Sequence, residues 1–501
     1  MIKKILIANR GEIALRVMRT CREMDIKSVA VYSEADRNSK HVMFADEAYF
    51  IGSSPSNESY LVIDKIIEAA KATKADAIHP GYGFLSEKAA FAERCKKESI
   101  IFIGPSAYAI DTMGDKITAR KYIIAANVPV VPGTTEKLTD EKEALKIIKE
   151  IGLPVIIKAS AGGGGKGMRM VKKESDVREA IRAAKSESLS AFGDDSIYIE
   201  RYIESPHHIE FQILADKFGN TIHLCERECS VQRRHQKVIE ETPSVIVTPE
   251  LREKMGKSAV AVAKSVNYEN AGTIEFLVDG KGNYYFLEMN TRLQVEHPIT
   301  EAVIGIDLVR EQINVANGLP LTYTQNQIKQ RGHAIECRIY AEDPQNNFMP
   351  CPGTIRNITE PQGIGVRTDG YVYSGYEIPI YYDPMISKII VWAETRSEAI
   401  NRMKRVFEEY KISGIKTSIG FMKHIMETPD FVNGTYDTRF IEKNHDFLFE
   451  KDTLIPAIED MAIIAAFIEY LSGNLKEAFE EKKSTIELWK SYGRLLNSRK
   501  L

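Results

Sequence analysis

The first hundred residues alternate short apolar runs with amphipathic stretches. Apolar runs at Ile5–Asn9 and Ser28–Tyr32 flank an amphipathic segment over about Ile13–Met24, and this order is typical of a βαβ unit in a parallel sheet. A further strand is expected at Ile100–Ile103, before Gly104-Pro105. We therefore expect an N-terminal α/β domain over residues 1–112.

The first turn of this unit excludes one common cofactor. It reads Asn9-Arg10-Gly11-Glu12, whereas a loop that holds a dinucleotide pyrophosphate needs three glycines. NAD binding is therefore not expected.

A glycine-rich segment lies between two predicted strands. The strand Pro154–Ala159 precedes GGGGKG at Gly162–Gly167, and a second short strand follows at Met168–Val171. A Walker loop opens a helix and has Ser or Thr after its Gly-Lys, so this hairpin is not a P-loop. Its backbone N–H groups, together with Lys158 and Lys166, could bind phosphate and close over a nucleotide; a plain flexible turn is the alternative.

Two carboxylates are predicted to face each other across a β-hairpin. The strands are Thr273–Val278 and Tyr284–Asn290. If Lys281-Gly282 is a two-residue turn, Glu275 lies directly opposite Glu288, with the two side chains about 5 Å apart on one face. Like charges so placed destabilise a sheet unless a cation lies between them, and Mg²⁺ prefers such oxygen ligands.

Polar residues continue this face at every second position along the chain. They are Glu288, Asn290, Arg292, Gln294 and Glu296. We interpret them as one functional face, the alternative being a solvated outer surface. A longer hairpin loop would change the pairing.

Composition and charge narrow the class of protein. The chain has 501 residues, 67 basic and 70 acidic side chains and a net charge of −3, which does not favour binding of nucleic acid through bulk electrostatics. No apolar run approaches the roughly 20 residues of a membrane span, and the start has no secretion signal. A cytoplasmic location is expected.

The six cysteines form no CxxC pair, as expected of reduced thiols. His223, Cys225, Cys229 and His235 could be drawn as a zinc site, although the CxxxC spacing is uncommon for zinc. The alternative is a set of buried thiols beside the charged segment Glu226–Glu241, whose arginines suit planar oxyanions.

Six motifs occur in a fixed order: IANRGEIA, HPGYGFLSE, MGDK, GGGGKG, QRRHQK and EMNTRLQVEHP. In this the chain resembles the biotin carboxylase family of ATP-grasp ligases, from residue 1 to about 446. The resemblance implies an α/β fold with a parallel-sheet N-terminal domain (1–112), an ATP-grasp domain (113–330) with a mobile lid near 131–203, and a C-terminal α/β domain (331–446). Beyond this match, residues 447–501 are predicted to form a helical extension, because their pattern indicates two amphipathic helices at about Pro456–Leu471 and Leu475–Leu496.

The resemblance also implies roles for individual residues. Nucleotide contacts would come from Lys116, Lys158, Gly163, Gly164, Gly165, Lys166, Met168, Glu200, Tyr202, Ile203, His208 and His235. Mg²⁺ or Mn²⁺ would be held by Glu275, Glu288 and Asn290. Bicarbonate would lie among Lys237, Arg292, Gln294, Val295 and Glu296, with Glu296 as its base, and Arg338 would face biotin.

The implied reaction needs a second polypeptide. No Ala-Met-Lys-Met biotin-attachment motif occurs, so biotin and the carboxyltransferase would be supplied by a partner in a homo- or hetero-oligomer. The extension resembles that of the biotin carboxylase component of two-subunit pyruvate carboxylases; a component of an acetyl-CoA or acyl-CoA carboxylase is the alternative. A carbamoyl-phosphate-forming ligase and an inactive ATP-binding scaffold are the other hypotheses.

Overall fold

The computed structural model describes residues 1–134, 138, 141–159, 169–192, 195–234, 236–449 and 461–471. It divides into two compact units, Met1–Phe449 and Glu450–Leu501. The first unit contains the sheets and the candidate site.

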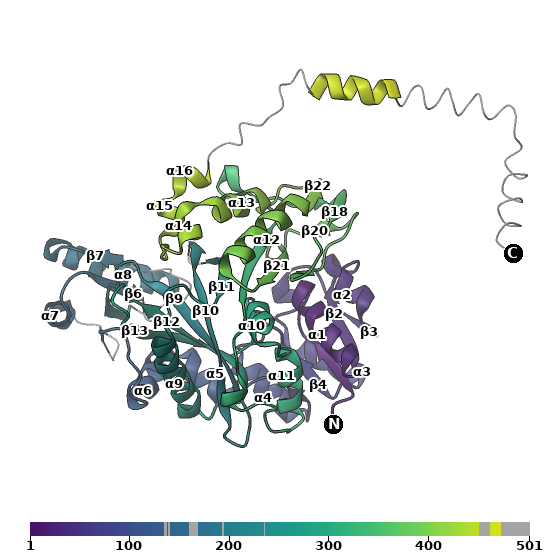
Figure 1. The fold of residues 1–501 in the computed structure, drawn as a ribbon. Coiled ribbons are helices and arrows are strands. Elements are labelled where there is room, and N and C mark those ends of the chain that lie inside the picture. Colours follow the sequence, from purple (N-terminus) through teal and green to yellow (C-terminus); the bar gives the residue numbers. More distant parts are fainter. Residues whose placement is uncertain are drawn as a thin grey trace, which may run out of the picture. The chain divides into compact units, whose positions relative to one another are not determined.

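The N-terminal domain is a five-stranded parallel sheet of order β3-β2-β1-β4-β5 (Figure 1). Its strands are β1 (Lys4–Ile7), β2 (Lys27–Ser33), β3 (Glu47–Gly52), β4 (Ala77–His79) and β5 (Ile101–Phe102). Its helices include α1 (Gly11–Glu23), α2 (Lys40–Phe44), α3 (Ile63–Thr73), α4 (Ala89–Lys97) and α5 (Ala107–Gly114). The apolar runs of β1, β2 and β4, the inner strands of this sheet, are buried, as in sheets covered on both faces. The predicted βαβ unit is confirmed.

A small three-stranded sheet of order β7-β6-β8 forms a separate layer. Its strands are β6 (Val155–Ala159), β7 (Arg169–Val171) and β8 (Ile197–Arg201), and α6 (Lys116–Ala125), α7 (Glu141–Ile151) and α8 (Val177–Phe192) accompany it in the chain. Val155, Ile157 and Ile199 pack with α7 and α8 in a core of their own. This sheet corresponds to the predicted lid region.

The largest sheet has eight strands in the order β13-β12-β9-β10-β11-β14-β21-β19. They are β9 (His207–Ala215), β10 (Thr221–Arg233), β11 (Gln236–Thr242), β12 (Asn270–Val278), β13 (Tyr284–Asn290), β14 (His333–Tyr340), β19 (Val366–Gly370) and β21 (Met385–Ala393). The helices α9 (Pro249–Ser265), α10 (His297–Ile304), α11 (Leu308–Ala316), α12 (Arg396–Glu409) and α13 (Ile419–Glu427) accompany it. Because β11 pairs with β14, one sheet joins the ATP-grasp part to the C-terminal part.

Short elements complete the C-terminal part. They are β15 (Glu342–Asp343), β16 (Met349–Pro350), β17 (Gly353–Thr354), β18 (Asn357–Thr359), β20 (Glu377–Ile378), β22 (Lys411–Ser413), α14 (Pro429–Asn433), α15 (Phe440–Lys443) and α16 (His445–Leu448).

The hairpin of β12 and β13 confirms the predicted pair but not the predicted turn. Glu275 is directly opposite Glu288. The loop, however, is one residue longer than predicted, because Asp279 rather than Gly280 pairs with Asn283. A β-bulge between Glu275 and Phe276 on the ladder absorbs this difference and restores the pairing.

The second unit contains a helix over residues 461–471. The remainder of the predicted helices Pro456–Leu471 and Leu475–Leu496 lies outside the described residues. Among the helices that the structure describes, none is long and apolar enough to cross a bilayer.

Candidate active site

A cavity of about 1330 Å³ gathers most of the predicted site residues. It is lined by Lys116, Glu200, Tyr202, Ile203, His208, Lys237, Glu275, Glu288, Asn290, Arg292, Gln294, Val295 and Arg338. Glu296 is fully buried at this site, where it accepts hydrogen bonds from Lys237 and Arg338. Gly163, Gly164, Gly165, Lys166, Met168, His235 and the side chain of Lys158 lie outside the described residues.

Lys237 is bound by three carboxylates at the centre of the site. Its Nζ donates to Glu275 Oε1 at 2.8 Å, to Glu296 Oε1 at 2.7 Å and to Glu210. Burial alone would lower the pKa of this ammonium, but the three carboxylates outweigh burial and raise it well above its ordinary value. Lys237 is therefore a permanent cation between Glu275, which is predicted to bind the metal, and Glu296, which is predicted to act as the base.

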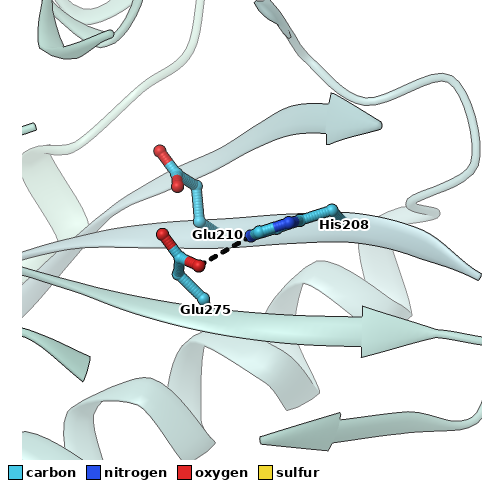
Figure 2. Close-up of side chains that lie close together, drawn as sticks. All are labelled: His208, Glu210 and Glu275. Carbon is cyan, nitrogen blue, oxygen red and sulfur yellow. Dashed lines mark ion pairs between the residues drawn. The ribbon is translucent and has the colours of Figure 1, made fainter. Parts of the chain in front are cut away.

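His208 and Glu210 of β9 lie beside Glu275 of β12, and the ring of His208 points toward the Glu275 carboxylate (Figure 2). His208 Nε2 is 2.8 Å from Glu275 Oε2. Burial disfavours the charged form of Glu275, yet Lys237 and His208 hold its pKa well below the ordinary value. Glu275 is therefore ionised across the physiological range.

Glu288 has the opposite electrostatic environment. The negative charge of Glu275 across the hairpin is the main cause that raises its pKa. Asn290 lies beside the pair and donates to Glu275 Oε1 at 2.8 Å. These oxygen-bearing side chains fit a hard divalent cation, because its charge would remove the repulsion that Glu288 experiences.

Arg338 of β14 extends the site toward the C-terminal domain. Its guanidinium donates to Glu296 Oε2 at 3.0 Å and forms an ion pair of 2.5 Å with Glu240 of β11. Burial opposes ionisation of Glu296, but Lys237 and Arg338 hold its pKa well below the ordinary value. Glu240, in contrast, has its pKa raised to about 7 by burial, despite Arg338.

The segment after β13 does not continue the strand. β13 ends at Asn290, and Glu296 is the residue before α10. The predicted polar face is therefore correct for Glu288 and Asn290 only. Beyond them a turn brings the side chains together, and Arg292 fixes its shape by donating to Gln294 Oε1 at 2.9 Å and Asn290 Oδ1 at 3.0 Å.

Glu200, Tyr202 and Ile203 line the same cavity, at and beyond the end of β8. Arg120 contacts Glu200 Oε1 at 3.3 Å, and the Tyr202 amide donates to the Pro154 carbonyl at 2.9 Å. β8 of the small sheet and α6 thus both contribute to this part of the cavity wall.

The zinc hypothesis receives no support from the part of the chain that is described. Within it, the groups of three possible ligands are His208, Glu210 and Glu275, and Glu210, Cys229 and Glu296. Neither group includes His223 or Cys225; the ring of His223 packs edge-on against Phe211 instead. The second group surrounds Lys237, which already supplies the positive charge.

Sequence reasoning missed several residues that hold the site in shape. Glu87 binds Arg292 at 2.8 Å, and Arg227, fully buried, binds Glu210 and donates to Gln212 Oε1 at 2.9 Å. The signal for Glu210 was present, because His208, Glu210 and Gln212 alternate with apolar residues in one strand. A polar face that is buried on both strands of a pair is unusual unless its polar groups form hydrogen bonds or ion pairs with one another.

Three family models match consecutive parts of the chain. They are "Biotin carboxylase, N-terminal domain" over residues 1–110, "Carbamoyl-phosphate synthase L chain, ATP binding domain" over 115–324 and "Biotin carboxylase C-terminal domain" over 336–443. With the fold and the cavity described above, they define an ATP-grasp ligase.

Relatives of known identity narrow the class. The A subunit of pyruvate carboxylase from Methanothermobacter thermautotrophicus is 58% identical over 443 residues, which is 88% of this chain and 90% of that protein. Biotin carboxylase of Nostoc sp. is 55% identical over 440 residues, 88% of this chain and 98% of that protein. The chain belongs to the biotin carboxylase family.

A solved structure agrees with this assignment. The biotin carboxylase domain dimer of Hydrogenobacter thermophilus 2-oxoglutarate carboxylase, in complex with MgADP, ADP and bicarbonate, has a TM-score of 0.85 and 48% identity. The match covers 89% of this chain and 99% of that one. The hypothesis of a carbamoyl-phosphate-forming ligase is set aside, because both flanking models and these relatives are biotin-dependent carboxylases.

Proposed function

We propose that this chain uses MgATP and bicarbonate to carboxylate biotin carried by a partner subunit. The observation that carries the proposal is the position of Lys237, which links the carboxylate pair Glu275 and Glu288 to the Glu296 and Arg338 pair. A nucleotide phosphate at one end and a biotin ring at the other would then meet at a shared anion position.

The nucleotide is assigned to the end of the cavity that contains Lys116 and Glu200 to Ile203. Glu275, Glu288 and Asn290 would hold Mg²⁺ or Mn²⁺, which offsets charge on the transferring phosphoryl oxygens. The Hydrogenobacter thermophilus domain binds MgADP and bicarbonate together. His208 lies next to this pair, where its proton stabilises the Glu275 carboxylate.

Bicarbonate is assigned to the turn that contains Arg292, Gln294, Val295 and Glu296, with Lys237 opposite. Glu296 must be ionised to accept the bicarbonate proton, and its low pKa meets this requirement. A carboxylate held so firmly by cations is a weak base, however. Bicarbonate that takes over the hydrogen bond of Lys237 would weaken this hold and make Glu296 more basic as the oxygen attacks the γ-phosphoryl group.

Biotin is assigned to the side of Arg338. Carboxyphosphate, formed with release of ADP, would break down to CO₂ and phosphate. The released phosphate would take the proton of the ureido nitrogen, which places negative charge on the ureido oxygen, and the nitrogen would then form the new N–C bond to CO₂. Arg338 is already positioned by Glu240 and Glu296 to offset this charge without further reorganisation.

For the final acceptor we propose pyruvate, with a biotin-carrying carboxyltransferase as the partner. Support comes from the Methanothermobacter relative and from length: the shared region covers 90% of that protein but 98% of the Nostoc biotin carboxylase. The Methanothermobacter protein therefore also has sequence beyond the shared part. An acyl-CoA carboxylase is the alternative.

Bicarbonate-dependent ADP release with free biotin tests the activity. Stimulation by biotin supports the proposal, stimulation by ammonia supports a carbamoyl-phosphate-forming enzyme, and no release supports an inactive scaffold. For the acceptor, the biotinylated partner would be isolated on streptavidin and fixation of labelled bicarbonate compared between pyruvate and acetyl-CoA. Fixation with acetyl-CoA alone would contradict the pyruvate assignment.

A further inference from the structure

A fully buried lysine from the C-terminal domain reaches the bicarbonate turn. Lys388 lies on β21, directly opposite Arg338 of β14, and its side chain has no exposed surface. Its Nζ donates to the backbone carbonyl of Val295 at 2.6 Å and lies 3.5 Å from Glu12 Oε1 of α1. One ammonium thus touches the N-terminal domain and the ATP-grasp domain at once.

The two peptide groups on either side of Val295 are both held at their carbonyl oxygens. His297 Nδ1 lies 2.8 Å from the Gln294 carbonyl oxygen. Burial, with Lys388, Arg16 and other cations nearby, keeps the pKa of His297 well below its ordinary value, so the ring is neutral. A carbonyl oxygen only accepts, and Nδ1 therefore carries the proton.

Because each peptide group is planar, a contact that holds its carbonyl oxygen also fixes the direction of its N–H group. In a trans peptide the N–H points away from the C=O of the same group. His297 therefore orients the Val295 amide, and Lys388 orients the Glu296 amide. Both amides belong to the turn assigned to bicarbonate, between Gln294 and the base Glu296.

We propose that Lys388 is a positioning residue for bicarbonate, which it serves by fixing the Val295 carbonyl and with it the backbone of the turn. This inference rests on the proposed function of the turn. Lys388 does not touch the substrate itself; it holds the Val295–Glu296 peptide in the orientation in which Glu296 faces Lys237 and Arg338.

A competing role for Lys388 is to neutralise Glu12. Burial raises the pKa of Glu12 to about 7, and Lys388 is the cation that opposes this most. The other acids near Lys388 are Asp369, directly opposite on β19 and bound by Arg367 at 2.6 Å, and Glu336 of β14. The Tyr82 ring lies 6.0 Å from Nζ. The test must therefore separate the contact with Val295 from the contact with Glu12.

Three variants make this separation. Lys388→Met keeps an unbranched side chain that is one atom shorter and removes the donor and the charge, whereas Lys388→Arg keeps the donor and the charge. The double variant Lys388→Met with Glu12→Gln also removes the carboxylate that would otherwise be buried without its cation, so it corrects for a loss of stability. For each, ADP release would be measured against bicarbonate at saturating MgATP and biotin, and against ATP at saturating bicarbonate.

We expect Lys388→Met to raise the KM for bicarbonate about 10- to 100-fold, by analogy with the loss of groups that orient metal-binding side chains. The KM for ATP should stay unchanged, and Lys388→Arg should recover much of the loss. The double variant should regain thermal stability and keep the raised KM for bicarbonate.

Recovery of the bicarbonate KM in the double variant would overturn the inference, because neutralisation of Glu12 would then explain the effect. An equal rise in both KM values would also overturn it. The unmodified chain distinguishes a failure of this inference from a failure of the proposed function. If its ADP release does not depend on bicarbonate, the proposed function fails as well.

Discussion

Replacement of Arg338 by Met should depress biotin carboxylation far more than ATP binding. Arg338 donates to Glu296 and pairs with Glu240, and its guanidinium lines the cavity. Loss of one preorganised group that faces developing negative charge lowers kcat by about 10²- to 10³-fold, or about 3–4 kcal/mol. We expect a fall of this size in biotin-dependent turnover, with the KM for ATP unchanged.

The same substitution should be tolerated by the fold. Removal of one partner from a buried ion pair costs about 3–5 kcal/mol when the other charge remains. Here Glu240 can lose its charge, because its pKa is already raised to about 7. Glu296 keeps its hydrogen bond of 2.7 Å from Lys237. The loss of stability should therefore be smaller than for a typical buried pair.

The assay is steady-state ADP release with biotin and ATP varied in turn, and unfolding monitored separately. Arg338→Lys serves as the control. It keeps the positive charge but not the planar guanidinium, so it should retain more biotin-dependent turnover than Arg338→Met. If biotin turnover and ATP binding fall by the same factor in Arg338→Met, the assignment of Arg338 to biotin is refuted.

Three further predictions concern the metal pair, a buried histidine and the second unit. Glu288→Gln should raise the concentration of Mg²⁺ needed for half-maximal ADP release by about 10-fold or more; an unchanged requirement would place the cation elsewhere. Burial lowers the pKa of His79 to about 4, and the ring accepts from the Gly81 amide at 3.0 Å. The unfolded chain binds this proton near pH 6.5, so stability should fall between pH 6.5 and 4 by up to about 3 kcal/mol from this residue. Chemical unfolding at pH 7 and 5 should therefore show a smaller difference for His79→Asn than for the unmodified chain, and an equal difference would contradict the assignment. Removal of residues 450–501 should leave ADP release with free biotin intact, because the described members of the candidate site lie in Met1–Phe449; loss of this activity in a folded truncated chain would contradict that placement.

The sequence predicted the facing carboxylates correctly from an incorrect turn. Counting from Lys281-Gly282 placed Glu275 opposite Glu288, whereas the observed loop shifts the register near the turn by one residue. The bulge beside Glu275 removes this shift. A bulge cannot be recognised from hydrophobic alternation alone. The extra residue shifts the alternation only in the part of the strand that follows it.

The turn after Asn290 shows where periodicity stops being informative. Arg292, Gln294 and Glu296 fall at alternate positions, as on a strand, yet the strand has ended. Their convergence depends on hydrogen bonds within the turn and on Glu87, which lies more than two hundred positions earlier in the chain. A local pattern can identify such residues as polar and close in sequence, but it contains no information on the distant partner that orients them.

The centre of the site depends on one sheet that runs through two domains. Because β11 pairs with β14, Lys237 and Glu240 of one domain lie near Arg338 of the next, and Glu296 joins them from the turn. Each of these charges would be costly to bury alone, and they are compatible with burial only as a set. The charges of this set come from β11, β14 and the turn before α10, which are far apart in the sequence. The order of the motifs was therefore enough to indicate the family, but the network around Arg338 could be recognised only from the strand order.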